Sequence, residues 1–186
     1  MFKSLAYEAM LFAREKHRGQ VRKYTGEPYF NHLAEVVAIS MSVGWQASMI
    51  HPDKVMAVAW LHDIIEDTDI KDTPFIIISL FGDDIFNGVL MLSDLEQGNR
   101  KTRKELSSKR LSDAPGWIQT IKCADLISNS TSIIEHDPEF AKVFCGEAVM
   151  LLDVMDKSDQ RLRDMAYGVC KNEKNENREM SKMLEE

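Results

Sequence analysis

A histidine and three carboxylic acids lie close together in a strongly apolar part of the chain. The segment is LHDIIEDTD (61–69), and the residues are His62, Asp63, Glu66 and Asp67. On a continuous helix that reaches Asp67, these side chains form a polar wedge beside the apolar face. A carboxylate buried without a partner loses its hydration at a prohibitive cost. The cluster therefore requires basic partners, raised pKa values or a metal ion.

A divalent metal ion accounts well for these residue types. Imidazole and carboxylate together suit Mn, Fe, Co, Ni or Zn better than Ca or Mg. Further ligands must come from other elements, and two candidates in apolar contexts are His32 and Asp125. Asn129 lies one helical turn beyond Asp125, on the same stripe. Together these residues favour a site over a buried histidine with a capping partner.

The other histidines have structural interpretations. His136-Asp137 is followed by a proline and a glutamate, which is typical of an N-cap with proline at the first helical position. His17 and His51 stand next to loop signals, and we expect both to be solvated.

The periodicity of the chain predicts helices and no sheet. FIIIS (75–79) has strand propensity, but the Thr-Pro before it favours a helix start. We therefore expect an all-α fold. The predicted helices cover residues 2–17, 28–43, 53–67, 73–82, 84–94, 100–112, 116–133, 138–155 and 158–169.

Length and composition set limits on the class of protein. The 186 residues fit a single domain over 1–170, followed by a polar tail or frayed helix over 171–186. The net charge of −7 argues against a general binder of nucleic acid or anionic membrane. No apolar run reaches the roughly 18 residues that span a bilayer. Cys123, Cys145 and Cys170 lack C-x-x-C spacing, so we expect reduced thiols in a cytoplasmic protein.

Positive charge is concentrated in two islands, KHRGQVRK (16–23) and RKTRKELSSKR (100–110). Each is either a local anion site or the cationic half of a mixed surface, and composition alone leaves both interpretations open. Tyr24 follows the first island, where it could stack on a nucleobase or simply pack.

Four ordered motifs resemble those of the HD-domain hydrolases of the RelA/SpoT type. They are AREKHRGQVRKYTGEPYFNH (13–32), AVAWLHDIIEDTD (57–69), FG (81–82) and IKCADLISN (121–129). The small stand-alone members, the Mesh1-like alarmone hydrolases, are the most similar in length and in the KRLSDAP stretch (109–115). The resemblance implies an HD-domain helical bundle. It also implies manganese-dependent removal of the 3′-pyrophosphate from (p)ppGpp, a small nucleotide.

The resemblance further implies roles for individual residues. The metal ligands would be His32, His62, Asp63 and Asp125. The residues acting on the attacking water would be Glu66 and Asp67. The nucleotide-binding residues would be Arg22 and Lys23, with Asn129 beside the ribose.

The chain departs from the family pattern at Leu126, where a basic residue usually follows the Ala-Asp pair. A positive charge near the metal is thus missing, which leaves the substrate open. One alternative is another HD nucleotide phosphohydrolase, acting on the 2′-phosphate of NADPH or on a nucleoside monophosphate. A second is a nucleotide-sensing module without turnover. The pair Glu66-Asp67 argues against a sensor, since a sensor has no need of a water-activating acid.

Overall fold

The computed structural model describes residues 4–45, 50–67 and 73–183, and its named elements are all helices, as predicted. The one extended pairing in these ranges is an isolated bridge between Val21 and Pro28. Among the described helices, none combines the length and apolar character needed to cross a membrane. The helices are α1 (Leu5–Lys16), α2 (Phe30–Met41), α3 (Pro52–Leu61), α4 (Ile64–Asp67), α5 (Thr73–Phe81), α6 (Asp83–Leu92), α7 (Arg100–Asp113), α8 (Gly116–His136), α9 (Pro138–Val154) and α10 (Gln160–Met183).

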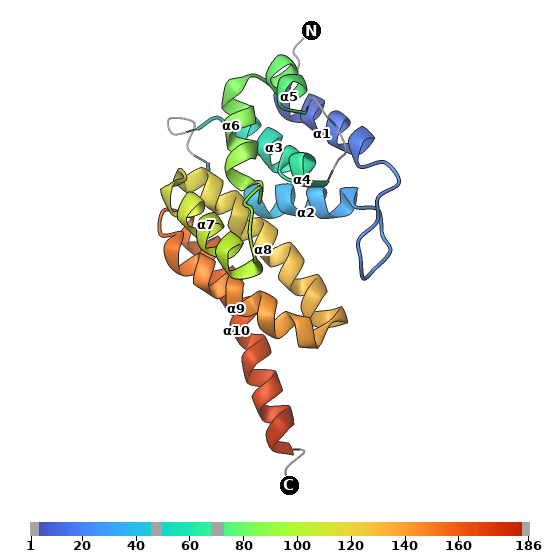
Figure 1. Cartoon of the computed structure of the whole chain (residues 1–186). Helices are drawn as coiled ribbons and strands as arrows, with labels where there is room; N and C mark the ends of the chain where they lie inside the picture. The colour runs from blue at the N-terminus through green and yellow to red at the C-terminus, as the bar shows by residue number, and fades with distance from the viewer. Residues whose placement is uncertain (1–3, 46–49, 68–72, 184–186) are drawn as a thin grey trace.

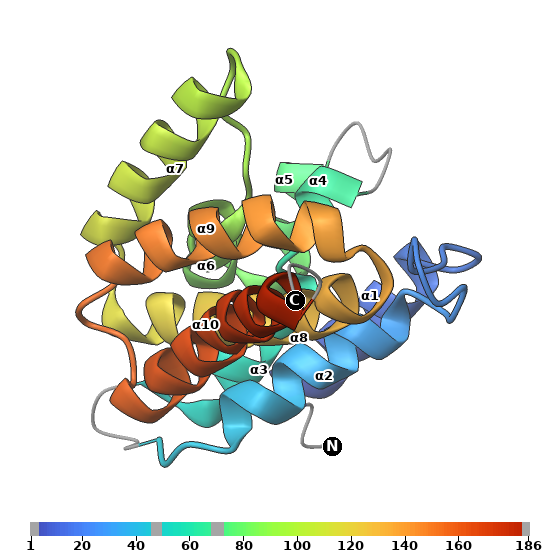
Figure 2. The same cartoon turned by 90° about the horizontal axis from the view of Figure 1, so that it is seen from below.

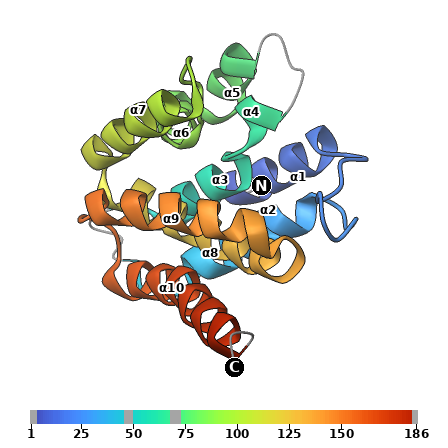
Figure 3. The same cartoon turned by 60° about the horizontal axis from the view of Figure 1, so that its bottom comes forward.

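The long helix α8 lies at the centre of the bundle (Figure 1). It packs against α2 on one side and against α9 and α10 on the other. Helix α3 packs against α1 and α2 and also touches α6. Figure 2 shows α7 along the flank of α9, which it contacts. Figure 3 shows α10 on the opposite side of α8 and α9 from α7.

Helix α3 is mostly apolar, which accords with its place in the interior. Helix α8 buries both apolar and polar side chains, because its neighbours cover it on several sides. The buried residues of α3 are Val55, Ala57, Val58, Ala59 and Leu61. Any polar side chain that these two helices bury therefore needs a partner inside the protein.

The predicted continuous helix over 53–67 is wrong. Helix α3 ends at Leu61, and α4 begins only after a turn at His62 and Asp63. His62 Nδ1 lies 2.8 Å from the carbonyl oxygen of Ala59. In a continuing helix this oxygen would accept a backbone N–H from the next turn, but here the His62 side chain takes that place. The turn lets two consecutive side chains reach one point, whereas on an ideal helix they diverge by about 100°.

Most other boundaries agree with the prediction to within a few residues. FIIIS lies in helix α5, as the Thr-Pro signal indicated. Asp137 caps α9 as predicted, since its side chain accepts the backbone N–H of Phe140 at 3.2 Å. Helix α8 runs on to His136, beyond its predicted end. Helix α10 continues to Met183, into the range expected to be a tail or frayed helix.

The start of α8 is fixed against the turn between α9 and α10. A Cβ atom at Gly116 would lie 2.2 Å from the carbonyl oxygen of Lys157. The carboxamide of Gln119 ties the same segments together. Its nitrogen donates to the Leu111 carbonyl at 2.9 Å, and its oxygen accepts the Lys157 N–H at 2.9 Å. These contacts fix the helix that carries Asp125.

We expect Gly116→Ala to destabilise the protein, because the Lys157 main chain cannot retreat without breaking its bond to Gln119. Overpacking of this kind commonly costs about 1–3 kcal/mol, measurable by chemical denaturation. Gly146→Ala is the matched control, since its added Cβ meets nothing within 4 Å. Alanine is favoured over glycine inside a helix by roughly 0.5–1 kcal/mol, so the control should be neutral or stabilised. Equal stability of Gly116→Ala and the wild type would contradict the close approach.

Candidate active site

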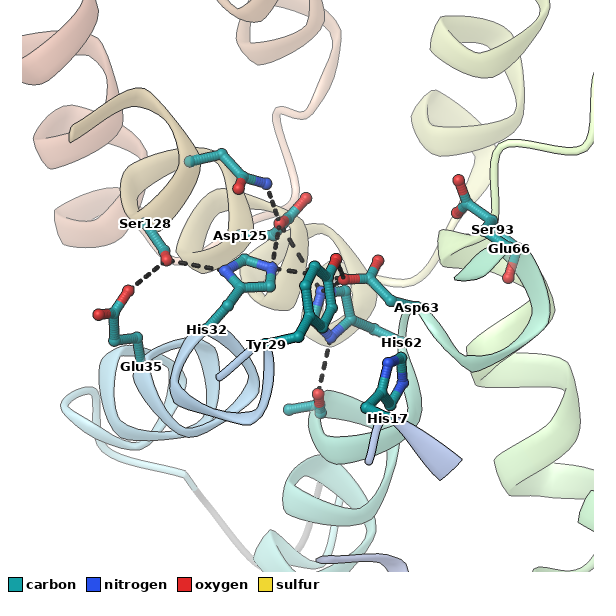
Figure 4. Close-up of polar contacts among 12 residues, drawn as sticks. His17, Tyr29, His32, Glu35, His62, Asp63, Glu66, Ser93, Asp125 and Ser128 are labelled. Carbon is teal, nitrogen blue, oxygen red and sulfur yellow. Dashed lines mark hydrogen bonds and ion pairs between the residues drawn. The ribbon is translucent and has the colours of Figure 1, made fainter. Parts of the chain in front are cut away.

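Four side chains from three segments meet in the core, as Figure 4 shows. His32 comes from α2, His62 and Asp63 from the turn after α3, and Asp125 from α8. His32 Nε2 lies 3.4 Å from Asp63 Oδ2 and 3.3 Å from Asp125 Oδ1. His62 Nε2 lies 3.0 Å from Asp63 Oδ2 and 3.7 Å from Asp125 Oδ1. The structure thus brings together the four residues expected to bind a metal ion.

Both histidines present the same nitrogen to the carboxylates. His62 Nδ1 lies 2.8 Å from the carbonyl oxygen of Ala59, which can only accept, so Nδ1 carries the hydrogen. His32 Nδ1 lies 2.9 Å from Ser128 Oγ, whose hydrogen goes to Glu35 at 2.5 Å, so His32 Nδ1 also donates. In the neutral rings both Nε2 atoms are therefore bare lone pairs. Both are buried, and neither has a hydrogen-bond partner within the described ranges.

Two buried lone pairs that face carboxylate oxygens need a cation between them. In a protein without a metal ion, protons fill this need, so the pKa values of both histidines are raised. Burial alone would lower these pKa values, but each Nε2, once protonated, can donate to the two aspartates, and these hydrogen bonds and charges outweigh burial. Ligand atoms of His32, His62 and Asp63 all lie within 4.8 Å of one another, and Asp125 adjoins them. This set of nitrogen and oxygen donors fits a divalent transition-series ion.

Outer hydrogen bonds orient the two carboxylates. The Tyr29 hydroxyl donates to Asp63 Oδ2 at 2.7 Å. The Lys122 ammonium donates to Asp125 Oδ2 at 2.8 Å, and the Asn129 amide donates to Asp125 Oδ1 at 2.7 Å. Burial would raise the pKa of both aspartates. The nearby histidines hold the Asp63 pKa far below its usual range, while Lys122 and then the histidines do so for Asp125.

Glu66 and Asp67 belong to α4, directly after the ligand turn. Glu66 Oε1 accepts the backbone N–H of Asp94 at 2.8 Å, on the side of α6 and α7. Burial raises the pKa of Glu66 to about 7 despite this hydrogen bond. Burial and the charge of Asp63 raise the pKa of Asp67. A carboxyl group with a pKa of about 7 can give or take a proton at neutral pH.

Arg22 reaches the centre from the loop between α1 and α2. Its guanidinium lies 3.1 Å from Glu35, 3.3 Å from Ser128 Oγ and 3.2 Å from Asn129 Oδ1. Its side chain is only 11% exposed. Arg22 therefore braces Asn129, which was expected beside the ribose, and the serine that orients His32.

Lys23 and Tyr24 make their described contacts at the junction of α8 and α9. The Lys23 ammonium donates to the Tyr24 hydroxyl at 3.1 Å, and that hydroxyl donates to Asp137 at 3.0 Å. The Tyr24 ring stacks near His136, with 6.2 Å between centroids. These two residues thus stand further along α8 than the four central side chains.

Sequence reasoning missed several residues that support the centre. Two of them stand one turn from Asp125 on α8, and one stands a turn from His32 on α2, so helical spacing was the available signal. They are Lys122, Ser128 and Glu35. The prediction that His17 is solvated is wrong, because its side chain is 2% exposed. Tyr29 stands three residues before His32, at the N-cap of α2, so the same spacing pointed to it.

A cavity of about 750 Å³ opens beside the centre, between α7, α8 and α9. Its volume suits a small-molecule ligand. Arg100 bridges α7 and α9, since its guanidinium donates to both carboxylate oxygens of Glu147 at 2.6 and 2.9 Å. The α7 wall of the cavity is cationic, the α9 wall is apolar, and the α8 wall adjoins the four central side chains. The lining residues include Arg100, Lys101 and Lys104 on α7, Phe144, Leu151 and Val154 on α9, and Lys122, Asp125, Leu126 and Asn129 on α8.

Comparison with known proteins places these observations in a family. The family model described as "HD domain" matches residues 9–115. A guanosine-3′,5′-bis(diphosphate) 3′-pyrophosphohydrolase, MESH1, of Drosophila melanogaster is 32% identical over 132 residues, which is 70% of either chain. The MESH1 of Xenopus tropicalis is 33% identical over 138 residues, which is 73% of either chain.

A solved structure has the same fold. It is described as "A metazoan ortholog of SpoT hydrolyzes ppGpp and plays a role in starvation responses". The TM-score is 0.76 at 23% identity, and the match covers 92% of this chain and 97% of that chain.

We expect Asp63→Asn to lose bound metal, because the amide removes a negative charge that faces both Nε2 atoms. Metal content after gel filtration and calorimetric titration with Mn²⁺ measure the loss. Metal binding should also stabilise the wild type, by about 2.7 kcal/mol at a free concentration 100 times Kd, and this gain should vanish in the variant. Asp156→Asn, at an exposed position, is the control. Stoichiometric metal in Asp63→Asn would remove Asp63 from the ligand set.

Proposed function

The chain belongs to the HD-domain family, and on that premise we propose that it is a metal-dependent (p)ppGpp 3′-pyrophosphohydrolase. The reaction takes ppGpp and water to GDP and pyrophosphate, and pppGpp to GTP and pyrophosphate. The observation that carries the proposal is one centre of two histidines and two ionised aspartates, flanked by Glu66, in which Asp125 also lines a nucleotide-sized cavity. Similarity to the MESH1 hydrolases supports it.

His32, His62, Asp63 and Asp125 would hold one divalent ion. We infer Mn²⁺ from the resemblance to the manganese-dependent hydrolases, and the mixed imidazole and carboxylate donors accord with it. When bound, the ion supplies Lewis acidity, which lowers the pKa of a water molecule and polarises a phosphoryl oxygen. The hydrogen bonds that the two Nδ1 atoms donate to Ser128 Oγ and to the Ala59 carbonyl would keep both Nε2 lone pairs directed at the ion.

Glu66 and Asp67 would manage the proton of the attacking water. Both follow the ligand turn directly, and neither is needed to complete the four ligands. With a pKa of about 7, Glu66 is partly ionised at neutral pH and can accept a proton as the phosphorus–oxygen bond forms.

The walls of the cavity fit a nucleotide polyphosphate. The ammonium and guanidinium groups of α7 can neutralise phosphates, and guanidinium matches phosphate with a planar fork. Asn129 lines the α8 side of the cavity, Arg22 contacts the Asn129 side chain, and Lys23 with Tyr24 lies further out. An acidic protein can thus bind a polyanion, because the cations are concentrated at one cavity. A nucleotide substrate of this kind and the three free, buried thiols both accord with a cytoplasmic enzyme.

Leu126 favours a second candidate substrate. It lines the cavity directly after Asp125, and it is apolar where the family usually has a cation. A phosphate ester with less negative charge would lose less binding energy from the absence of this cation. The alternative is therefore the 2′-phosphate of NADPH or a nucleoside monophosphate, with the same centre and the same acids. A module that senses nucleotides without turnover has no use for the flanking acids.

We expect Glu66→Gln to lower kcat while metal stays bound, because the amide keeps the shape but cannot take a proton. Loss of one general acid–base group commonly costs about 10²–10⁴-fold. If Glu66 is the base, wild-type kcat rises with pH through about 7 and the variant loses that rise. Glu105→Gln is the control, since Glu105 lines the same cavity but pairs only loosely with Lys101. If Glu66→Gln and Asp67→Asn both keep near-normal kcat, the proton is handled elsewhere.

The substrate is decided by kcat/KM for ppGpp, NADPH and nucleoside monophosphates, all at one Mn²⁺ concentration. We expect ppGpp to be the most efficient, with pyrophosphate as the released product identified by mass spectrometry. The reason is that the cationic α7 wall supplies several charges for a second phosphate group. Phosphate release from NADPH or a monophosphate, without pyrophosphate from ppGpp, would establish the alternative.

A further inference from the structure

Asp94 contacts the proposed base Glu66, yet it is neither a ligand nor an acid of the reaction. It lies in the segment between α6 and α7, where residues 93–97 form neither helix nor strand. Its backbone N–H donates to Glu66 Oε1 at 2.8 Å. A regular helix would direct such a donor, but in this segment the direction depends on the contacts that hold the segment. The contacts of Asp94 therefore decide where its N–H points.

Glu66 depends on such a donor, because packing does not hold its side chain. The residue is exposed, and helix α4 around it is only 4 residues long. In Figure 4 Glu66 stands apart from the four central side chains, on the side of Ser93. A long, exposed side chain samples several rotamers, whereas a general base must lie within about 2.6–3.2 Å of the proton it takes. A fixed hydrogen-bond donor limits this motion.

One face of α7 binds the Asp94 carboxylate. The Ser107 hydroxyl donates to Asp94 Oδ1 at 2.7 Å. The Arg110 guanidinium donates to the same oxygen at 2.8 Å, and the Lys104 ammonium donates to Oδ2 at 3.3 Å. The three donors are spaced three residues apart on α7, so they share one face of the helix. Two of the three bonds join opposite charges, which makes them stronger than bonds between neutral groups.

Arg110 also holds the chain on both sides of Asp94. Its guanidinium donates to the Met91 carbonyl in the last turn of α6 and to Glu96 Oε1 at 2.7 Å. A guanidinium presents several N–H donors in a rigid planar fork, so one side chain can bind these acceptors and Asp94 together. This end of the basic island on α7 thus binds a segment of the protein itself rather than an anion.

Resting on the function proposed above, we propose that Asp94 is a positioning residue for Glu66. Ser107 and Arg110 hold the Asp94 carboxylate, and the held carboxylate directs the backbone N–H of the same residue. This N–H keeps the Glu66 side chain in one rotamer beside the ligand turn. Asp94 takes no proton itself, and its role is to limit the motion of the group that does.

The competing interpretation is that Asp94 acts only through its charge. It lines the cavity, where a carboxylate repels an anionic substrate. Two variants separate these roles, and both keep the backbone N–H. Asp94→Asn loses the charge but keeps an oxygen that can accept from Ser107 and Arg110. Asp94→Ala loses the charge and both contacts. A role through charge alone predicts equal behaviour of the two variants.

We expect Asp94→Ala to lower kcat by about 10–100-fold, the range typical of losing an outer partner of a catalytic centre. Asp94→Asn should keep most of kcat, because the accepting oxygen remains. In both variants KM should not rise, since a charge that repels the substrate is gone. The affinity for Mn²⁺ should stay close to wild type, because Glu66 is not one of the four ligands.

A double variant tests whether the effect passes through Glu66. If Asp94 acts by holding Glu66, Asp94→Ala should cause no further loss of kcat once Glu66→Gln has removed the base. Two residues that act through separate groups would instead show losses that multiply.

Ser107→Ala tests the contact with α7 without changing a charge or either residue of the Asp94–Glu66 pair. The variant removes the donor that lies 2.7 Å from Asp94 Oδ1. In ¹⁵N-labelled protein the hydrogen-bonded Asp94 amide should exchange slowly with solvent, and Ser107→Ala should speed this exchange. The measurement needs no turnover, and it also tests the proposal if Asp94→Ala fails to fold.

The matched control is the same pair of substitutions at Asp84. This carboxylate also binds an ammonium group, that of Lys54 at 2.6 Å, but its side chain is 77% exposed. Asp84→Ala and Asp84→Asn should leave kcat and the exchange of the Asp94 amide unaltered.

Four results would each overturn the proposal. The first is equal kcat in Asp94→Asn and Asp94→Ala, which indicates a role through charge or no role. The second is a multiplied loss of kcat in the double variant. The third is near-normal kcat in Glu66→Gln, which removes the group to be positioned. The fourth is unchanged exchange of the Asp94 amide in Ser107→Ala.

The kinetic comparison uses the best substrate of the wild type. Failure of ppGpp hydrolysis with turnover of another phosphate ester therefore rejects the proposed function and still tests Asp94. Absence of any turnover rejects both.

Discussion

Two imidazole lone pairs and two carboxylates face one another in the core, and together they require a positive charge between them. The contacts around the centre serve this requirement. Each partner would be unstable there without a positive charge between them. The surrounding protein fixes both Nδ1 atoms and three of the four carboxylate oxygens. The Ala59 carbonyl and Ser128 hold the histidine hydrogens away from the centre, while Tyr29, Lys122 and Asn129 hold the carboxylate oxygens. The fold thus leaves one kind of occupant, a cation, as the solution.

The packing of the bundle brings the four residues of the centre together from distant parts of the sequence. Helices α2 and α8 pack together, and α2 also packs on α3, so the three segments that carry the ligands share one junction. The contact of Gly116 with Lys157 and the bonds of Gln119 set the position of α8 along its axis. The C-terminal helices therefore contribute to the centre without supplying a ligand.

Sequence patterns predicted the all-α fold, most helix boundaries and the set of residues that gather at the centre. His32 and Asp125 were found because each stands among apolar residues, where a charge needs a reason. The turn at His62 and Asp63 could not be predicted from periodicity, because the apolar pattern continues through it and the break depends on a side-chain contact with Ala59. His17 was misjudged for a related reason. Its neighbours in sequence are polar loop residues, but the ring is covered by Tyr29, which is distant in the chain.

The bridge from Arg100 to Glu147 has a consequence for how tightly the cavity holds an anion. The guanidinium already has a bidentate carboxylate partner across the cavity. A phosphate that engages Arg100 exchanges one anion for another, so it gains only the difference between the two contacts. Such an exchange favours the binding of groups that carry more negative charge than a carboxylate. The cavity should therefore bind polyphosphates in preference to monoanions. It also frees α9 from α7 at that point, so selectivity for charge and the width of the cavity are coupled through a single side chain.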